Sequence, residues 1–138
     1  MRAVLDRYAE QVLSGIFEVL SKQATLDETL DTLINFASRD PKMETGCLFY
    51  KMRAGKHRLG PLTRQRVEEI DATAVRAYED FLVARRDAGD WAADRPVGST
   101  ARYLSEQIAL ALTQRAADQD KDQIQETLEL ALSVLRRR

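Results

Sequence analysis

Apolar residues recur at helical spacing along most of the chain, and the first such stretch runs from Arg2 to Lys22. Its polar positions recur every three or four residues and leave a very wide apolar arc, which predicts a helix that neighbours cover on most sides. Gly15 lies inside this stretch, where glycine costs about 1 kcal/mol of helix stability relative to alanine. Such a glycine is compatible with a close helix crossing, with a gap beside the helix or with no constraint at all.

The next stretch opens with Thr25 and Glu28 at capping-box spacing, which predicts that a second helix begins there. Pro41 prevents this helix from continuing beyond Asp40. Residues 45–52 form an apolar run short enough to be a buried strand or a short helix. Periodicity does not decide between them, but no other strand candidate could pair with this run, so we expect a helix.

Three further helices are predicted in the second half of the chain. Residues 53–60 read as a loop, and Gly60-Pro61 reads as the start of a long helix that Gly89 ends. Residues 90–98 form a connector, after which Ser99 or Thr100 is expected to cap a helix. Asp120 is expected to cap the last helix, so that the final two helices form an αα-hairpin. The pattern therefore predicts an all-α bundle of about six helices.

The length of the chain and its net charge limit the number of domains and the kinds of partner that we expect. A chain of 138 residues fits one compact domain, residues 1–138. The 21 basic and 22 acidic residues leave a formal charge of -1, so no overall field favours nucleic acid or a membrane surface as a partner. The first 20 residues are interrupted by charges and predict neither a signal peptide nor a membrane span. We expect a soluble, cytoplasmic protein.

No residue pattern indicates catalysis. Cys47 has no second cysteine to pair with, and together with the single histidine, His57, it provides no ligand set for zinc. His57 lies between two cations without a carboxylate to orient it. We therefore expect no enzyme, no metal and no cofactor. Residues 51–66 carry six basic side chains and no acid, which leaves open a solvated loop or a surface that contacts phosphate or another domain.

The order of these elements resembles the C-terminal regulatory domain of TetR-family transcriptional regulators. The shared features are the short helix that opens with Gly46-Cys47-Leu48, the long helix that ends at Gly89, and the terminal hairpin from Leu104 to Leu135, LSEQIALALTQRAADQDKDQIQETLELALSVL. The resemblance covers essentially the whole chain. In that family a three-helix head reads the DNA major groove. This sequence starts where that head would join, so DNA contact is expected only through a missing N-terminal head.

The resemblance also implies two sets of functional residues. A pocket for a small apolar or amphipathic ligand is expected among the first four helices, with Tyr78, Cys47 or Asn35 as polar contacts. Its lining is predicted to include Phe17, Leu20, Leu33, Phe36, Phe49, Tyr78 and Phe81. A four-helix contact with a second copy is predicted to use Leu104, Ile108, Ala111, Leu112, Leu128, Ala131, Leu132 and Leu135. The alternatives are an ordinary filled core and a monomer whose hairpin faces inward.

The leading hypothesis is therefore a small-molecule-sensing, homodimerising domain of a TetR-like repressor. The alternative is a headless interaction protein that pairs with a full-length regulator.

Overall fold

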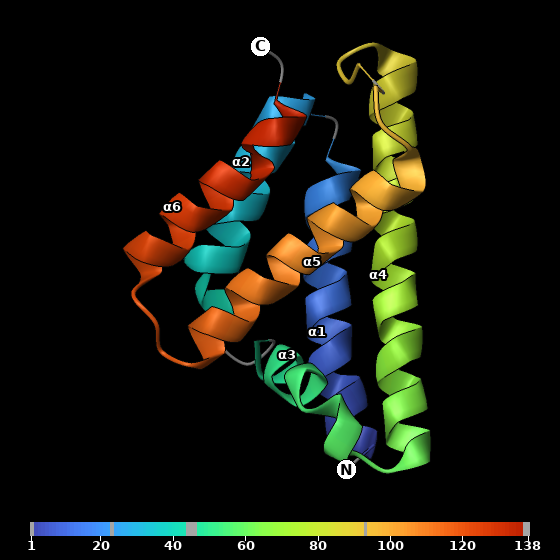
Figure 1. Cartoon of the computed structure of the whole chain (residues 1–138), viewed down its shortest axis with the longest axis vertical. Coiled ribbons are helices and arrows are strands. Elements are labelled where there is room, and N and C mark those ends of the chain that lie inside the picture. Colours follow the sequence, from blue (N-terminus) through green and yellow to red (C-terminus); the bar gives the residue numbers. More distant parts are fainter. Residues whose placement is uncertain (1, 23, 44–46, 93, 137–138) are drawn as a thin grey trace.

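The computed structural model describes residues 2–22, 24–43, 47–92 and 94–136, and these are almost entirely helical (Figure 1). No strand occurs among them. The six α-helices are α1 (Arg2–Ser21), α2 (Leu26–Ser38), α3 (Cys47–Ala54), α4 (Pro61–Ala88), α5 (Val97–Ala116) and α6 (Lys121–Leu132). Three short 3-10 helices are η1 (Pro41–Met43), η2 (Lys56–Arg58) and η3 (Ser133–Leu135). The predicted all-α bundle of about six helices is confirmed.

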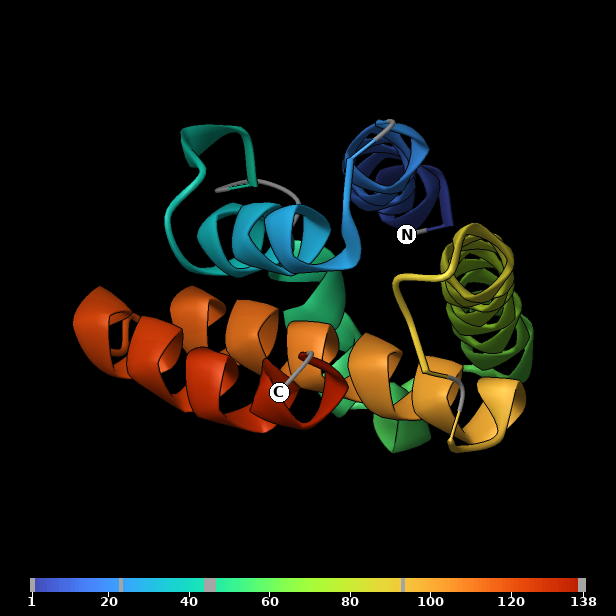
Figure 2. The ribbon, with the colours of Figure 1, turned by 90° about the horizontal axis from the view of Figure 1, so that it is seen from above.

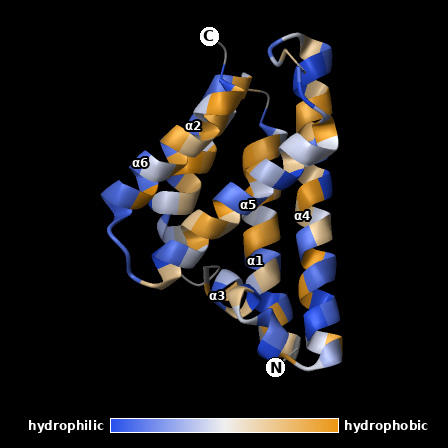
Figure 3. Cartoon of the chain, viewed as in Figure 1, coloured by the Kyte–Doolittle hydropathy of each residue, from blue (hydrophilic) through white to orange (hydrophobic). Residues whose placement is uncertain are grey.

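The helices form two layers with α4 along one side (Figure 2). The antiparallel hairpin of α5 and α6 makes one layer, and α1 and α2 lie over it. The central helix is α5, because it contacts α2, α3, α4 and α6. Hydrophobic residues are spread along all six helices (Figure 3), and their buried members form one continuous core.

Local signals set several helix ends as expected. At the start of α2 the Thr25 hydroxyl accepts a hydrogen bond from the Glu28 N–H at 3.2 Å and donates to the Glu28 carboxylate. Gly89 ends α4 in the left-handed conformation, with φ of 84°, where a side chain would be strained. Asp120 caps α6 by accepting from the Asp122 N–H at 2.8 Å. These ends follow from short-range chemistry that the sequence displays directly.

Two predicted boundaries were wrong. The predicted loop at 53–60 is partly helical, since α3 extends to Ala54 and η2 follows it. The fifth helix begins at Val97 after Pro96, rather than after Ser99 or Thr100. The Pro96 carbonyl accepts both the Thr100 N–H at 3.0 Å and the Thr100 hydroxyl at 2.8 Å, so Thr100 already lies in the first turn. The short apolar run is helical as predicted from Cys47 onward, whereas Gly46 lies outside the described residues.

Candidate functional site

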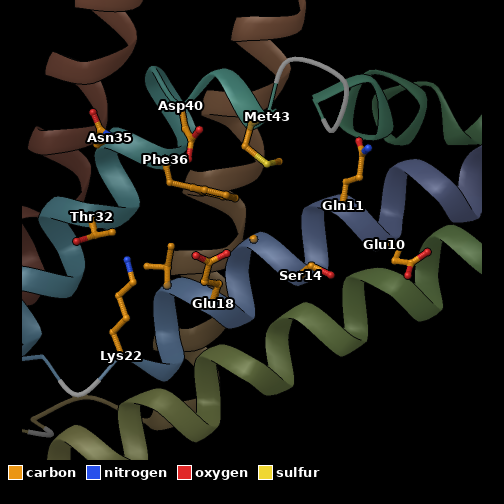
Figure 4. A pocket seen from close by; sticks show the side chains of 12 residues that line it. Glu10, Gln11, Ser14, Glu18, Lys22, Thr32, Asn35, Phe36, Asp40 and Met43 are labelled. Atoms are coloured by element: carbon orange, nitrogen blue, oxygen red, sulfur yellow. The ribbon is translucent and has the colours of Figure 1, made fainter.

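A groove of about 600 Å³ runs between α1 and α2 (Figure 4). The α1 side contributes a stripe of residues at helical spacing, and the opposite wall comes from α2, the residue before η1 and η1 itself. Its lining residues are Glu10, Gln11, Ser14, Gly15, Glu18, Val19, Lys22, Thr32, Asn35, Phe36, Asp40 and Met43. In Figure 4, Glu18 and Lys22 extend from α1 toward α2, and Met43 extends toward α1.

The two walls meet where Gly15 faces Phe36. A Cβ atom added to Gly15 would lie 2.6 Å from Cε2 and 3.0 Å from Cζ of the Phe36 ring. Carbon atoms that are not bonded pack at about 3.5–4.0 Å, so only glycine admits the ring at this position. The Met43 sulfur lies 3.5 Å from the same point, and Phe36 and Met43 are both buried. Gly15 therefore marks a close helix crossing, which was one of the three predicted possibilities, and the groove has an aromatic and thioether floor.

The groove carries more negative than positive charge. Its lining holds Glu10, Glu18 and Asp40 but only one basic residue, Lys22. Glu10 and Glu18 are exposed, and neither forms an ion pair with any residue that the structure describes. The lining thus combines exposed carboxylates and one lysine with a buried apolar floor.

A buried arginine holds the α2 wall of this groove from behind. Arg115 of α5 is 5% exposed and donates hydrogen bonds to the carbonyl oxygens of Phe36 at 3.4 Å and Asp40 at 2.5 Å. These carbonyls belong to the last turn of α2 and the residues after it, where a cation is favoured by the helix dipole. The sequence analysis did not single out Arg115. Its position among Ile108, Ala111 and Leu112 on the apolar stripe of α5 could have revealed a buried charge.

The predicted ligand-lining residues are divided between two grooves and the core. Phe36 lines the α1–α2 groove, as does Asn35, one of the predicted polar contacts. A second groove of about 330 Å³ between α1 and α4 includes Phe17, Leu20 and Phe81. Phe17 follows Gly15 by two residues, which turns it about 200° around α1 and onto the other side of the helix.

Three more predicted lining residues, Leu33, Phe49 and Tyr78, lie in the core, and neither groove includes them. The Tyr78 hydroxyl is buried and has no hydrogen-bond partner among the described residues. Burial raises the pKa of both Tyr78 and Tyr50, so both phenols stay neutral. The rings of Phe49 and Tyr50 meet edge to face, with centroids 5.1 Å apart. These aromatic side chains belong to the hydrophobic core.

The basic segment 51–66 is partly neutralised by acids from other helices. Arg53 donates to Asp71 at 2.8 Å and also pairs with Glu106. Arg66 donates to Asp6 at 2.8 Å. Burial raises the pKa of Asp71, while the Arg53 guanidinium opposes that rise. These pairs fix α3 and the start of α4 to the bundle, so the segment is less positive than its sequence indicates.

The predicted dimer residues lie mostly inside the chain, against its own helices. Ala131 is half-buried, and the other seven are buried by the chain's own helices: Leu104, Ile108, Ala111, Leu112, Leu128, Leu132 and Leu135. The exposed large apolar residues of the hairpin are instead Leu110, Leu130 and Val134, with 47%, 74% and 50% of their surfaces exposed. A stripe that packs on its own core and one that packs on a partner have the same spacing, so the pattern alone does not distinguish them.

The outer face of the hairpin bears no charged side chain along two parallel stripes. We call this surface the hairpin face; it consists of Tyr103, Gln107, Leu110 and Gln114 on α5 and Gln123, Thr127, Leu130 and Val134 on α6. Gln107, Leu110, Gln114 and Thr127 line one hollow of this surface, and Tyr103 and Val134 line another that Arg95 borders. The Tyr103 hydroxyl donates to the Ala131 carbonyl at 2.5 Å and holds α5 against α6.

Other chemistry is sparse in the described part of the chain. His57 is exposed, and no group of three or more His, Cys, Asp and Glu side chains could hold a metal ion there. None of the helices described is both long and apolar enough to span a bilayer. The side chain of Cys47, a predicted polar contact, lies outside what the structure describes.

Comparison of the chain with known protein families, with curated proteins and with solved structures finds no match.

Proposed function

We propose that this chain is the sensory and homodimerising domain of a TetR-like transcriptional regulator, and that its ligand binds in the α1–α2 groove. The groove is the observation that carries the proposal. Its volume of about 600 Å³ falls within the range of about 300–1,000 Å³ that small-molecule sites occupy. Its floor is apolar and its rim polar, which suits an amphipathic molecule.

The groove is placed where an occupant can move α1. A ligand seated there touches α1 on one side and Phe36 and Met43 on the other. Arg115 ties the α2 wall to α5, so that wall belongs to the body of the bundle. An occupant that binds better to a wider crossing therefore shifts the population toward states in which α1 has moved relative to α5. In a TetR-like regulator, α1 is the helix that leads to the DNA-binding head.

The hairpin face supports pairing with a second copy. Charged residues make up 31% of the chain, yet this surface has none along either stripe. Depletion of charge is typical of interface centres, because a buried charge loses its hydration. A two-fold contact places the same surface against itself, and an uncharged surface meets its own copy without repulsion.

A blocking variant tests the groove as the ligand site. Ser14 is exposed and lines the groove, so Ser14→Phe is expected to fill it without disturbing the core. Ala72, an exposed residue of α4, provides the matched control Ala72→Phe. We expect amphipathic compounds that raise the melting temperature of the wild-type chain to lose their effect on Ser14→Phe and to keep it on Ala72→Phe. Compounds that stabilise all three proteins equally would place the site elsewhere, and a library without any stabilising compound would refute the sensing function.

A further inference from the structure

The contact between Gly15 and Phe36 lies in the α1–α2 groove itself, where α1 and α2 cross. We propose that the Phe36 ring, seated against Gly15, locks this crossing closed, and that the groove takes its occupant when ring and glycine separate. This inference rests on the proposed ligand site and adds how access to that site is regulated. It follows from the fit of the ring, the attachment of α2 and the absence of polar contacts along the middle of α1.

The ring occupies space that any other residue at position 15 would fill with its own side chain. A Cβ atom there would lie 2.6 Å from Cε2 of Phe36, about 1 Å closer than carbon atoms pack without a bond. The sulfur of Met43 lies 3.5 Å from the same point. The two helices are therefore as close at this position as a glycine permits, and a side chain at position 15 would hold them further apart.

Three arginines join α2 to the α5–α6 hairpin: Arg39, Arg115 and Arg136. Arg39 donates to Gln125 of α6 at 2.6 Å, and Arg136 donates to Asp31 of α2. Arg115, which is 5% exposed, donates from α5 to two carbonyl oxygens at the end of α2 and just after it. These hydrogen bonds fix the helix that carries the ring, so α2 moves with the hairpin.

The middle of α1 has no comparable attachment. Its polar contacts to other elements lie near its two ends, where Asp6 accepts from Arg66 at 2.8 Å and the Ala24 carbonyl accepts from Arg85 at 2.7 Å. Between them, residues 7–21 form no hydrogen bond or ion pair with another element in the part of the chain that the structure describes. Apolar packing alone holds this stretch, so α1 is the helix that yields when the crossing opens.

A lock of this kind competes with an occupant of the groove. The apparent affinity for that occupant falls by the fraction of molecules in which the crossing is open. Gly15→Ala disfavours the closed crossing, because the new Cβ meets the ring only when the crossing is closed. An extra carbon in a packed site costs about 1–3 kcal/mol, so the open-to-closed ratio is expected to rise about 5- to 150-fold.

A buried thiol in the groove measures this opening. Met43 is 2% exposed, and Met43→Cys in a Cys47→Ser background leaves one thiol in the chain. We expect Gly15→Ala to raise the rate of its reaction with iodoacetamide about 5- to 150-fold under native conditions. Gly98→Ala on α5 is the matched control, because its Cβ would meet nothing closer than 3.5 Å, and it is expected not to raise the rate.

A second thiol separates opening of the crossing from unfolding of the chain. Ala101 of α5 is fully buried and outside the groove lining, so Ala101→Cys reports unfolding. Alanine at position 15 stabilises both folded forms against the unfolded chain, which offsets about fivefold of the increase at position 101 and none at position 43. We therefore expect the increase at position 43 to be about fivefold larger. Equal increases at the two positions would overturn the lock.

The Phe36→Leu background identifies the ring as the group that closes the crossing. Leucine lacks the atoms that approach Gly15, so Gly15→Ala is expected to leave the rate at position 43 nearly unchanged there. An increase as large as that in the wild-type background would overturn the assignment to Phe36.

The lock and the ligand site fail in different ways. An unchanged labelling rate at position 43 in Gly15→Ala would overturn the lock, whereas the Ser14→Phe test would still decide whether the groove is the ligand site. A compound library that stabilises nothing would refute the ligand site, and with it the regulation of ligand access, whatever the labelling rates show.

Discussion

The contact between Gly15 and Phe36 predicts an unusual response to an alanine substitution. At an ordinary helical position Gly15→Ala would stabilise the chain by about 1 kcal/mol, because alanine is the better helix former. Here the new Cβ would lie 2.6 Å from Cε2 of the Phe36 ring. The ring is 4% exposed and cannot swing into solvent without leaving the core. Forcing one carbon into a packed site costs about 1–3 kcal/mol, so we expect a net loss of about 0–2 kcal/mol.

A double-mutant cycle separates the steric cost from the helix propensity. Leucine lacks the Cε2 and Cζ atoms that approach Gly15, so in a Phe36→Leu background Gly15→Ala is expected to stabilise the chain by about 1 kcal/mol. The difference between the two backgrounds is a coupling energy of about 1–3 kcal/mol, within the range for residues in contact. Urea unfolding monitored by far-UV circular dichroism measures all four free energies. Trp91, which is the chain's one tryptophan and is buried, provides an independent fluorescence signal.

One outcome of this cycle would refute the argument. If Gly15→Ala stabilised the wild-type and Phe36→Leu chains equally, the ring would not lie against Gly15, and the groove would lose the floor on which its proposed ligand rests. Ser14→Ala supplies a matched control for helix propensity, because Ser14 is the exposed neighbouring position. We expect it to have the same small effect in both backgrounds.

Two further predictions concern the hairpin and the half-buried Asp71. Leu110→Glu with Leu130→Glu is expected to convert a dimer into a monomer with unchanged helix content, because four carboxylates would meet in the paired interface. Light scattering measures the mass, and Leu62→Glu on α4 is the control. A dimer unaffected by the double substitution would rule out the hairpin face. Burial raises the pKa of Asp71 above its usual 3.8. Between pH 3.8 and the raised pKa, the folded chain holds more protons than the unfolded chain, so the contribution of this group to stability falls as the pH rises. Asp71→Asn is expected to remove that part of the decline in urea-unfolding free energy above about pH 4, and parallel curves for the two proteins would contradict the raised pKa.

The sequence by itself determined the helices and several of their ends. Apolar spacing identified five of the helical stretches, and the short run at 45–52 was predicted as a helix because no second strand could pair with it. The caps at Thr25, Gly89 and Asp120 follow from groups within a few residues of one another. Such interactions are local, so the residue order displays them directly. The start of α5 was missed because a backbone carbonyl, that of Pro96, accepts the first hydrogen bonds there, and no side chain marks it.

Only the tertiary structure decided which surfaces these helices share. Gly15 admits Phe36, Arg115 reaches the end of α2, and Arg53 finds Asp71 and Glu106 because the chain brings distant positions together. The sequence also could not show that Leu104 and Leu128 pack inside the chain while Leu110 and Leu130 remain exposed. Burial in a core and burial at an interface favour the same apolar spacing, because both remove the same surface from water. Which of the two occurs depends on the three-dimensional packing of the other helices.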